Sequence, residues 1–399
     1  MTYNKVVIVC GPVTHRESQQ QHGNWHGGGD GNDEVDQDRG FEFTFDCSMA
    51  RVGAGRGENG SIIESDSIPS TMAASSSIGE ATSTSSDINW SLGNDDSASL
   101  SDSVQAFPEE FGRTYHAYRA GSYAFPNDAP EQERLELQGE AIKMLLGNKL
   151  FFAPLSHSNP PRTILDLATG VGDWAIQMGD QFPDSLIIGT DLSPIQPAEV
   201  PPNVHFYVED STDPWDFNQK FDYIHTRFTC GCWSSFETQI AEQAFAALEP
   251  GGWFESQEID GNICCDDNTL APDGPLAVWS NDLITASEKL GRPAIVGINL
   301  KEIFERVGFV DVQQRIYKMP IGGWAKDQRL KEIGYMWGIN VLDGVTGFSL
   351  QLFSKAFERT SAQIEVSLID VRRDLTNHRI HAYMPAFIVW GRKPQLGEK

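Results

Sequence analysis

Two acidic residues and the glycine-rich turn between them suit a ligand that contains a ribose. Asp166 lies at the end of one apolar run, residues 168–172 read ATGVG, and Asp191 ends the next apolar run. Gly170 and Gly172 allow the backbone to turn sharply and to approach a ligand closely. A carboxylate in the position of Asp191 can accept hydrogen bonds from the hydroxyls of a ribose. The stretch therefore indicates a nucleotide-type cofactor.

The same turn separates two possible cofactors. A dinucleotide fingerprint has a third glycine where the pyrophosphate rests on the helix N-terminus, but here Asp173 opens the helix. A carboxylate at that place repels a pyrophosphate. Asp166 suits the sulfonium and ammonium groups of S-adenosylmethionine, in direct contact or through a water molecule. The pattern favours S-adenosylmethionine over NAD, and a unit that binds no ligand is the third alternative.

These groups need a strand, a helix and a second strand to position them. Residues 162–167 and 186–188 are apolar enough for buried strands, and residues 174–182 have helical periodicity. This order is the first βαβ half of a nucleotide-binding α/β fold. Later strands are expected at 204–208, 221–225, 253–257, 309–318 and 381–389, the last of them antiparallel.

Polar residues follow two of the later strands. Asp210 and Ser211 follow residues 204–208, and His225 and Arg227 end the strand that begins at residue 221. Ligands of open α/β sheets lie beyond the carboxyl ends of the strands. We therefore expect His225 and Arg227 to face the reacting groups. A buried His225 that only bonds a loop is the alternative.

Six segments belong to one pattern in the second part of the chain. They are GRTYHAYRAGSYAFPND at 112–128, LDLATGVGDWA at 165–175, GTDLSPIQP at 189–197, FDYIHTRF at 221–228, LEPGGWFESQEID at 248–260 and IHAYMP at 380–385. Together they resemble the fungal LaeA-type family of S-adenosylmethionine-dependent class I methyltransferases. They keep the family's order and spacing across about residues 107 to 395.

The resemblance implies a Rossmann-like α/β fold. Its seven-stranded, mostly parallel sheet has helices on both faces and a helical insert before the last strand. Asp210 would accept the adenine amino group, and an N-terminal segment commonly closes over the cofactor in such enzymes. Tyr115, His116 and Arg119 are therefore lid candidates, or they anchor that segment on the core. The implied cofactor residues are Asp166, Ala168, Gly170, Gly172, Asp191, Leu192, Asp210 and Ser211.

Ala168 departs from the family pattern. The family usually reads D-L-G-x-G-x-G, and alanine replaces the first of these glycines. A methyl group is tolerated there if the residue keeps φ below zero. We therefore expect Ala168 to have a negative φ.

The chemistry implied is an in-line displacement at a sulfonium methyl group. Alignment of the reacting atoms can contribute about 7–11 kcal/mol to such a step. Where a hydroxyl or carboxyl acceptor needs a base, His225 and His116 are the imidazoles available, with Arg227 beside them. The chain has no Asn-Pro-Pro-Tyr type motif, which serves nitrogen acceptors, so an oxygen acceptor or a carbon acid is favoured.

The composition excludes several classes of partner. The net charge of −26 argues against direct nucleic-acid binding, which needs a basic surface. No run reaches the roughly 18 apolar residues that span a bilayer. The six cysteines lack zinc-type spacing, so we expect reduced thiols and no metal. A cytoplasmic or nuclear protein without membrane attachment follows.

Composition also divides the chain. Residues 1–106 are rich in Gly, Ser and Asp and are expected to form a disordered acidic arm. Residues 107–160 would form the lid and a helix, and residues 161–395 the methyltransferase domain. The insert at about 322–373, with several aromatic residues, could roof a substrate pocket.

Three functions remain open from the sequence. The first is an enzyme that methylates a small molecule of fungal secondary metabolism, which the aromatic-rich insert favours. The second is a LaeA-like nuclear regulator that works with a protein partner in a velvet-type complex, which the long polar arm favours. The third is an NAD enzyme.

Overall fold

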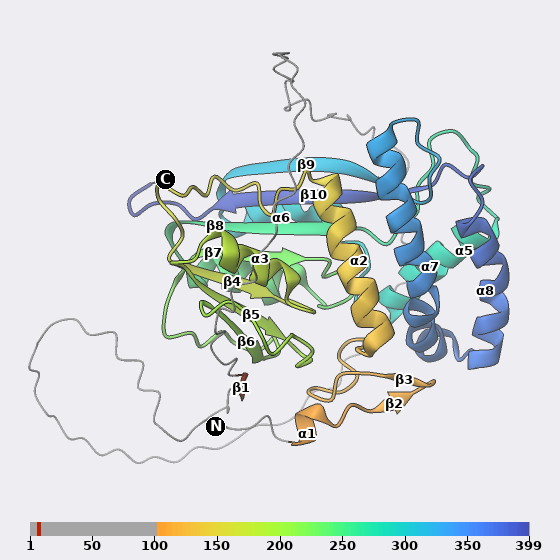
Figure 1. Cartoon of the computed structure of the whole chain (residues 1–399), viewed down its shortest axis with the longest axis horizontal. Helices are drawn as coiled ribbons and strands as arrows, with labels where there is room; N and C mark the ends of the chain where they lie inside the picture. The colour runs from red at the N-terminus through yellow and green to blue at the C-terminus, as the bar shows by residue number, and fades with distance from the viewer. Residues whose placement is uncertain (1–5, 9–101, 399) are drawn as a thin grey trace, which may run out of the picture. The chain divides into compact units, whose positions relative to one another are not determined.

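A computed structural model describes residues 6–8 and 102–398 (Figure 1). Most of the arm expected at residues 1–106 lies outside these described residues. The three residues Val6–Ile8 form strand β1, which the sequence did not predict. All the described residues belong to one compact unit.

The main sheet has the strand order β1-β6-β5-β4-β7-β8-β10-β9. Strands β4 to β8 are parallel to one another, β10 is antiparallel between β8 and β9, and β1 is antiparallel at the edge beside β6. The seven-stranded, mostly parallel sheet is thereby confirmed, with β1 as an eighth strand. The later strands are β4 (Thr163–Leu167), β5 (Leu186–Asp191), β6 (Val204–Val208), β7 (Phe221–Arg227), β8 (Leu248–Ile259), β9 (Val310–Pro320) and β10 (Tyr383–Arg392). A separate hairpin consists of β2 (Glu109–Glu110) and β3 (Arg113–Thr114).

Neighbouring residues of each buried strand point to opposite sides of the sheet. Both faces are therefore apolar, and helices cover both. Ile164 and Ile187 belong to one apolar core, and Leu165 and Ile188 belong to the other. The helices are α1 (Asp102–Gln105), α2 (Ala129–Leu145), α3 (Asp173–Gln181), α4 (Glu242–Ala247), α5 (Pro275–Lys289), α6 (Leu300–Val307), α7 (Gln328–Phe357) and α8 (Ser361–Leu375), with a π-turn, η1 (Glu237–Ala241), and a 3-10 turn, η2 (Gly297–Asn299).

The insert before the last strand is helical, as expected. Its long helix α7 packs against α2, α5 and α8 (Figure 1). The side chain of Asp128 accepts a hydrogen bond from the amide of Glu131 and so caps the N-terminus of α2. Thr360 and Gln363 form a reciprocal capping box at the start of α8. These caps fix where the helices around the site begin.

Residues 6–8 and 102–398 show neither a membrane-spanning helix nor a metal-binding cluster. No helix in this part of the chain is both long enough and apolar enough to cross a membrane. The same residues contain no group of three or more His, Cys, Asp or Glu side chains placed to hold a metal ion.

Candidate functional site

A cleft lies beyond the carboxyl ends of β4, β5 and β6. Its accessible volume is about 130 Å³. Six of the eight expected cofactor residues line it together: Ala168, Gly170, Asp191, Leu192, Asp210 and Ser211. Asp166 and Gly172 do not line it. Asp166 is buried, and Gly172 directly precedes α3, where an added Cβ would lie 2.5 Å from the Phe206 ring.

Asp191 is bonded to the backbone at both of its oxygens. One oxygen accepts from the amide of Gly170 and the other from the amide of Ser193, each at 2.9 Å. Burial raises the pKa of Asp191 to about 6, although these backbone bonds act in the opposite direction. A carboxylate has about four acceptor sites. Asp191 therefore keeps acceptor capacity on each oxygen for a ligand.

Asp210 has a similar free acceptor. Its Oδ1 accepts from the amide and the hydroxyl of Thr212, at 3.0 and 2.7 Å. Its Oδ2 lies 4.0 Å from the guanidinium of Arg119. Ser211 is held by Trp233, whose indole N–H donates to its hydroxyl at 2.8 Å. The end of β6 thus presents an oriented carboxylate to the cleft.

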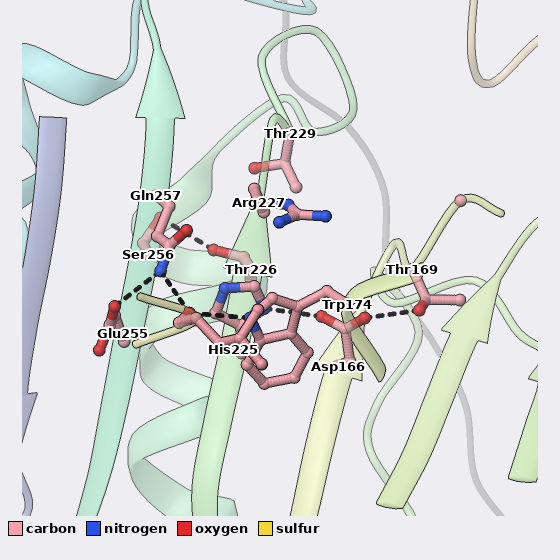
Figure 2. Close-up of polar contacts among 12 residues, drawn as sticks. Asp166, Thr169, Trp174, His225, Thr226, Arg227, Thr229, Glu255, Ser256 and Gln257 are labelled. Atoms are coloured by element: carbon pink, nitrogen blue, oxygen red, sulfur yellow. Dashed lines mark hydrogen bonds and ion pairs between the residues drawn. The ribbon is translucent and has the colours of Figure 1, made fainter. Parts of the chain in front are cut away.

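Beneath the cleft, Asp166 joins two elements (Figure 2). Its Oδ2 accepts from the hydroxyl of Thr169 at 2.5 Å, and its Oδ1 accepts from His225 Nδ1 at 2.8 Å. The carboxylate therefore supports the turn from below. It is buried and does not line the cleft, which leaves contact through a water molecule as the form of the expected cofactor role.

The orientation expected for His225 is wrong. Its side chain is 0% exposed, and the indole of Trp174 lies flat over the imidazole. Burial lowers the pKa of His225, against the effect of Asp166. The physical reason is the position of α3, whose second residue is Trp174 and covers this point of β7 (Figure 2). The alternative, a buried histidine that only bonds a loop, is right about the burial, but the partner Asp166 belongs to strand β4 and not to a loop.

Arg227 does line the cleft, because it lies two residues farther along β7 on the same face as His225. Its guanidinium is 3.9 Å from the carboxylate of Asp173. Burial lowers the pKa of Arg227, and Asp166 and Asp173 oppose that shift. The side chain places a positive charge at the rim of the cleft.

The expectation for Ala168 is also wrong. Its φ is +53°, in the left-handed region where a Cβ is strained. The turn imposes this value, since the amide of Thr169 bonds the carbonyl of Thr190 at 2.9 Å and the amide of Gly172 bonds that of Thr169 at 3.0 Å. Ala168 therefore occupies a glycine-type position without being glycine.

The segment before α2 contributes His116 to the cleft. Its Nε2 lies 3.1 Å from the carbonyl oxygen of Arg119, which can only accept, so Nε2 carries the proton. The other nitrogen, Nδ1, is buried and has no hydrogen-bond partner among the described residues. Burial lowers the pKa of His116. Arg119 pairs with Asp213 at 2.7 Å, whereas Tyr115 is buried away from the cleft.

A second, largely apolar cavity of about 270 Å³ adjoins the cleft. Trp337 and Phe348 of α7 line it, which agrees with the roof expected from the insert. Trp279, Phe228 and Arg292 line it too, and no sequence pattern predicted a place for them in a pocket. Seven residues border both spaces: Ser122, Tyr123, Phe125, Leu135, Gln138, Phe228 and Arg292.

Comparison with known proteins identifies the family. A family model described as a methyltransferase domain matches residues 138–314. The methyltransferase pytC of Aspergillus terreus is 39% identical over 297 residues, which cover 74% of this chain and 91% of pytC. The chain belongs to the fungal LaeA-type family of S-adenosylmethionine-dependent class I methyltransferases. This membership removes NAD as the alternative cofactor.

Relatives of this methyltransferase also include a regulator. The secondary metabolism regulator LAE1 of Cochliobolus heterostrophus is 33% identical over 291 residues, covering 72% of this chain and 94% of LAE1. Among solved structures, phosphoethanolamine N-methyltransferase 2 of Haemonchus contortus in complex with S-adenosyl-L-methionine has a TM-score of 0.39 and 16% identity, over 64% of this chain and 53% of that one. That score is too low to add to the family assignment.

The cleft of this methyltransferase fits a donor-rich ligand such as S-adenosylmethionine. Asp191 and Asp210 both retain free acceptor capacity, which matches ribose hydroxyls and an adenine amino group. A Cβ added at Gly170 would meet only the Leu135 side chain, at 3.9 Å, so the turn leaves open space above it. The residues present therefore fit the cofactor of the family.

Proposed function

We propose that this chain transfers a methyl group from S-adenosylmethionine to an oxygen of a small molecule of fungal secondary metabolism. The observation that carries the proposal is the common wall between the cleft and the apolar cavity. A cofactor in the cleft and an acceptor in the cavity would lie next to each other where these shared residues border both spaces. Alignment of this kind supplies much of the rate of a displacement reaction.

The cofactor roles follow from the free acceptors and charges of the cleft. Asp191 would accept both ribose hydroxyls, and Asp210 the adenine amino group. The backbone of residues 168–172 would approach the cofactor closely. Arg227 would face the cofactor's carboxylate. Bound there, the sulfonium supplies an already activated methyl group.

His116 is the better placed of the two candidate bases. Its buried Nδ1 has a lone pair without a partner among the described residues, and the residue lines the cofactor cleft beside the residues that border both spaces. The lowered pKa keeps the imidazole neutral near pH 7, so it can take the proton of an acceptor hydroxyl. His225 would act as a positioning residue through Asp166.

A regulatory role is the second candidate function, because relatives in the family include regulators such as LAE1. In that case the chain would act with a protein partner in a velvet-type complex, in the cytoplasm or the nucleus. The apolar cavity supports the enzyme over this alternative, since a binding role alone does not need it.

A labelling experiment separates the two candidates. Purified full-length protein and S-adenosylmethionine with a radioactive methyl group are incubated with an extract of a strain that lacks the gene. Label in an organic-soluble compound, absent with the Asp191→Ala variant, would support the enzyme. Label confined to protein, or no transfer although the cofactor binds, would contradict it and favour the regulator.

A further inference from the structure

The charged residues of the apolar cavity are all basic. Arg134, Arg292 and Lys355 line it, and no Asp or Glu does. The whole chain has a net charge of −26, so a cavity whose charged side chains are all positive differs from the rest of the protein. A ligand in the cavity would therefore meet positive charge and no carboxylate.

Arg134 is neutralised by its own surroundings. Its guanidinium bonds both oxygens of Glu131, at 2.6 and 3.0 Å, and its Nη1 donates to Gln138 and Asn340 at 2.8 and 2.7 Å. The side chains of Arg134 and Glu131 are each 4% exposed. Arg134 therefore serves the packing of α2 against α7 and has little capacity left for a ligand.

Arg292 and Lys355 lack such a partner. Arg292 donates from Nη1 to the carbonyl of Cys232 at 2.5 Å, and Lys355 donates to Gln351 at 2.8 Å. Within residues 102–398, neither forms an ion pair with a carboxylate. Glu110 is bonded to the other end of the Gln351 side chain, which stands between it and Lys355.

Aromatic rings form another part of the same wall. Trp337 lines the cavity and is buried, and its indole N–H has no partner among the described residues. The ring lies near that of Phe228, with centroids 6.0 Å apart. The wall therefore combines aromatic surface with two cations that form no ion pair among the described residues, a combination that suits an apolar molecule with a negative charge.

We propose that the methyl acceptor is an apolar organic anion, such as a carboxylate or an enolate, held by Arg292 and Lys355. This inference rests on the proposed function. Arg292 borders both spaces, so it places the charged end of the acceptor beside the cofactor cleft. The apolar body lies among the rings of α5 and α7. A neutral molecule of the same size leaves both cations without a counter-charge.

A matched pair of fluorescent probes tests the charge preference. The anion 8-anilinonaphthalene-1-sulfonate and neutral N-phenyl-1-naphthylamine share nearly the same apolar body. Each is titrated into the full chain saturated with S-adenosylhomocysteine. The anion should bind about tenfold more tightly, and Arg292→Gln or Lys355→Met should remove most of that preference. Lys331→Met, also on α7 but outside the cavity, is the matched control and should change neither affinity.

Location and folding are checked in the same samples. Leu283→Trp, which fills the cavity, should reduce the binding of both probes. Circular dichroism shows whether Arg292→Gln folds; Lys355 is an exposed side chain, so its variant carries the test if Arg292→Gln does not. Equal affinity for the two probes, or an unchanged preference in Lys355→Met, would overturn the inference. Failure of S-adenosylhomocysteine to bind the wild type would instead overturn the proposed function.

Discussion

The imidazole of His225 lies parallel to the indole of Trp174, with ring centroids 3.7 Å apart and an interplanar angle of 6°. The same imidazole donates from Nδ1 to Asp166, whose other oxygen holds Thr169 of the glycine-rich turn. These contacts connect α3, β7, β4 and the turn in one buried group. The geometry of the cleft thus depends on a histidine that does not reach it.

The burial of His225 predicts a pH dependence of stability. Its pKa is lower in the folded protein than the value of about 6.5 in the unfolded chain. The unfolded state therefore binds more protons, and the residue's contribution to the free energy of unfolding falls as the pH drops below about 6.5. Urea denaturation at pH 7.5 and 5.5 should show a larger loss for the wild type than for His225→Gln.

Comparison of the two proteins is needed because other groups titrate in the opposite direction. Burial raises the pKa of Glu258 to about 7, so that group stabilises the fold as the pH falls through this range. Both proteins share this effect, and it cancels in the difference. Equal losses in the two proteins would contradict a depressed pKa at His225.

Ala168→Gly should stabilise the protein. The left-handed conformation of alanine costs about 1–2 kcal/mol, and glycine loses about 0.4–1 kcal/mol through the greater entropy of the unfolded chain. We expect a net gain of about 0.5–1 kcal/mol in the free energy of unfolding. The control Ala175→Gly, inside α3, should destabilise. A loss of stability in Ala168→Gly would show that its methyl group has favourable contacts that outweigh the strain.

Asp191→Ala should weaken the binding of S-adenosylhomocysteine about ten- to a hundredfold, the loss expected for hydrogen bonds to a charged group. Calorimetry gives the affinity. The control Asp222→Ala removes a carboxylate at the opposite end of β7, where it pairs with Arg162, and should leave binding unchanged. Wild-type affinity in Asp191→Ala would place the ribose elsewhere.

The same carboxylate predicts a pH dependence of binding. Since the pKa of Asp191 is about 6, protonation below that pH removes the charge that accepts the ribose hydroxyls. The affinity for S-adenosylhomocysteine should fall by up to tenfold per pH unit below about 6 and level off above pH 7. Asp191→Asn should bind weakly with a flat profile between pH 5 and pH 8. A flat profile in the wild type would argue against an ionised Asp191 in the complex.

His116→Gln distinguishes a hydroxyl acceptor from the carboxylate or enolate proposed for the apolar cavity. A hydroxyl that needs a base would lose about 10²- to 10⁴-fold in methyl transfer, whereas the anion would lose little, and cofactor affinity should stay within a few fold in either case. The rate of label transfer and calorimetry with S-adenosylhomocysteine measure the two quantities. An unchanged rate would mean that the reacting oxygen or carbon is already ionised when it binds, which leaves no proton for His116 to remove.

The sheet and the cofactor cleft were predictable because their signals are local. A glycine turn between two buried strands, with one acidic residue at the end of the second strand and another after the strand that follows, predicts Asp191 and Asp210 at the same edge of a parallel sheet. The helical insert also followed from its own composition. Strand β1 was missed because Val6–Ile8 is a short apolar run beside a long polar one, and its partner β6 is distant in the chain.

The errors concern packing between distant elements. Nothing near His225 in the sequence indicates that Trp174 covers it, because Trp174 belongs to helix α3, which β5 and β6 separate from β7 in the sequence. Alanine usually has a negative φ, whereas at position 168 the hydrogen bonds of the turn impose a positive φ. Arg292, Trp279 and Lys355 come from separate segments, so the cavity that they share is not visible in any one of them.

The position of β10 has a consequence for biosynthesis. Strand β10 follows β9 in the sequence, yet it lies between β8 and β9 and bonds both. Until β10 has been synthesised, β9 has no neighbour to join, and the exposed edges of β8 and β9 are open to wrong pairing. The sheet therefore cannot close before β10 is made. A premature stop codon only a few residues into β10 would release a chain in which β9 is unpaired and β8 keeps one open edge beside its pairing with β7, and we expect cellular quality control to degrade it.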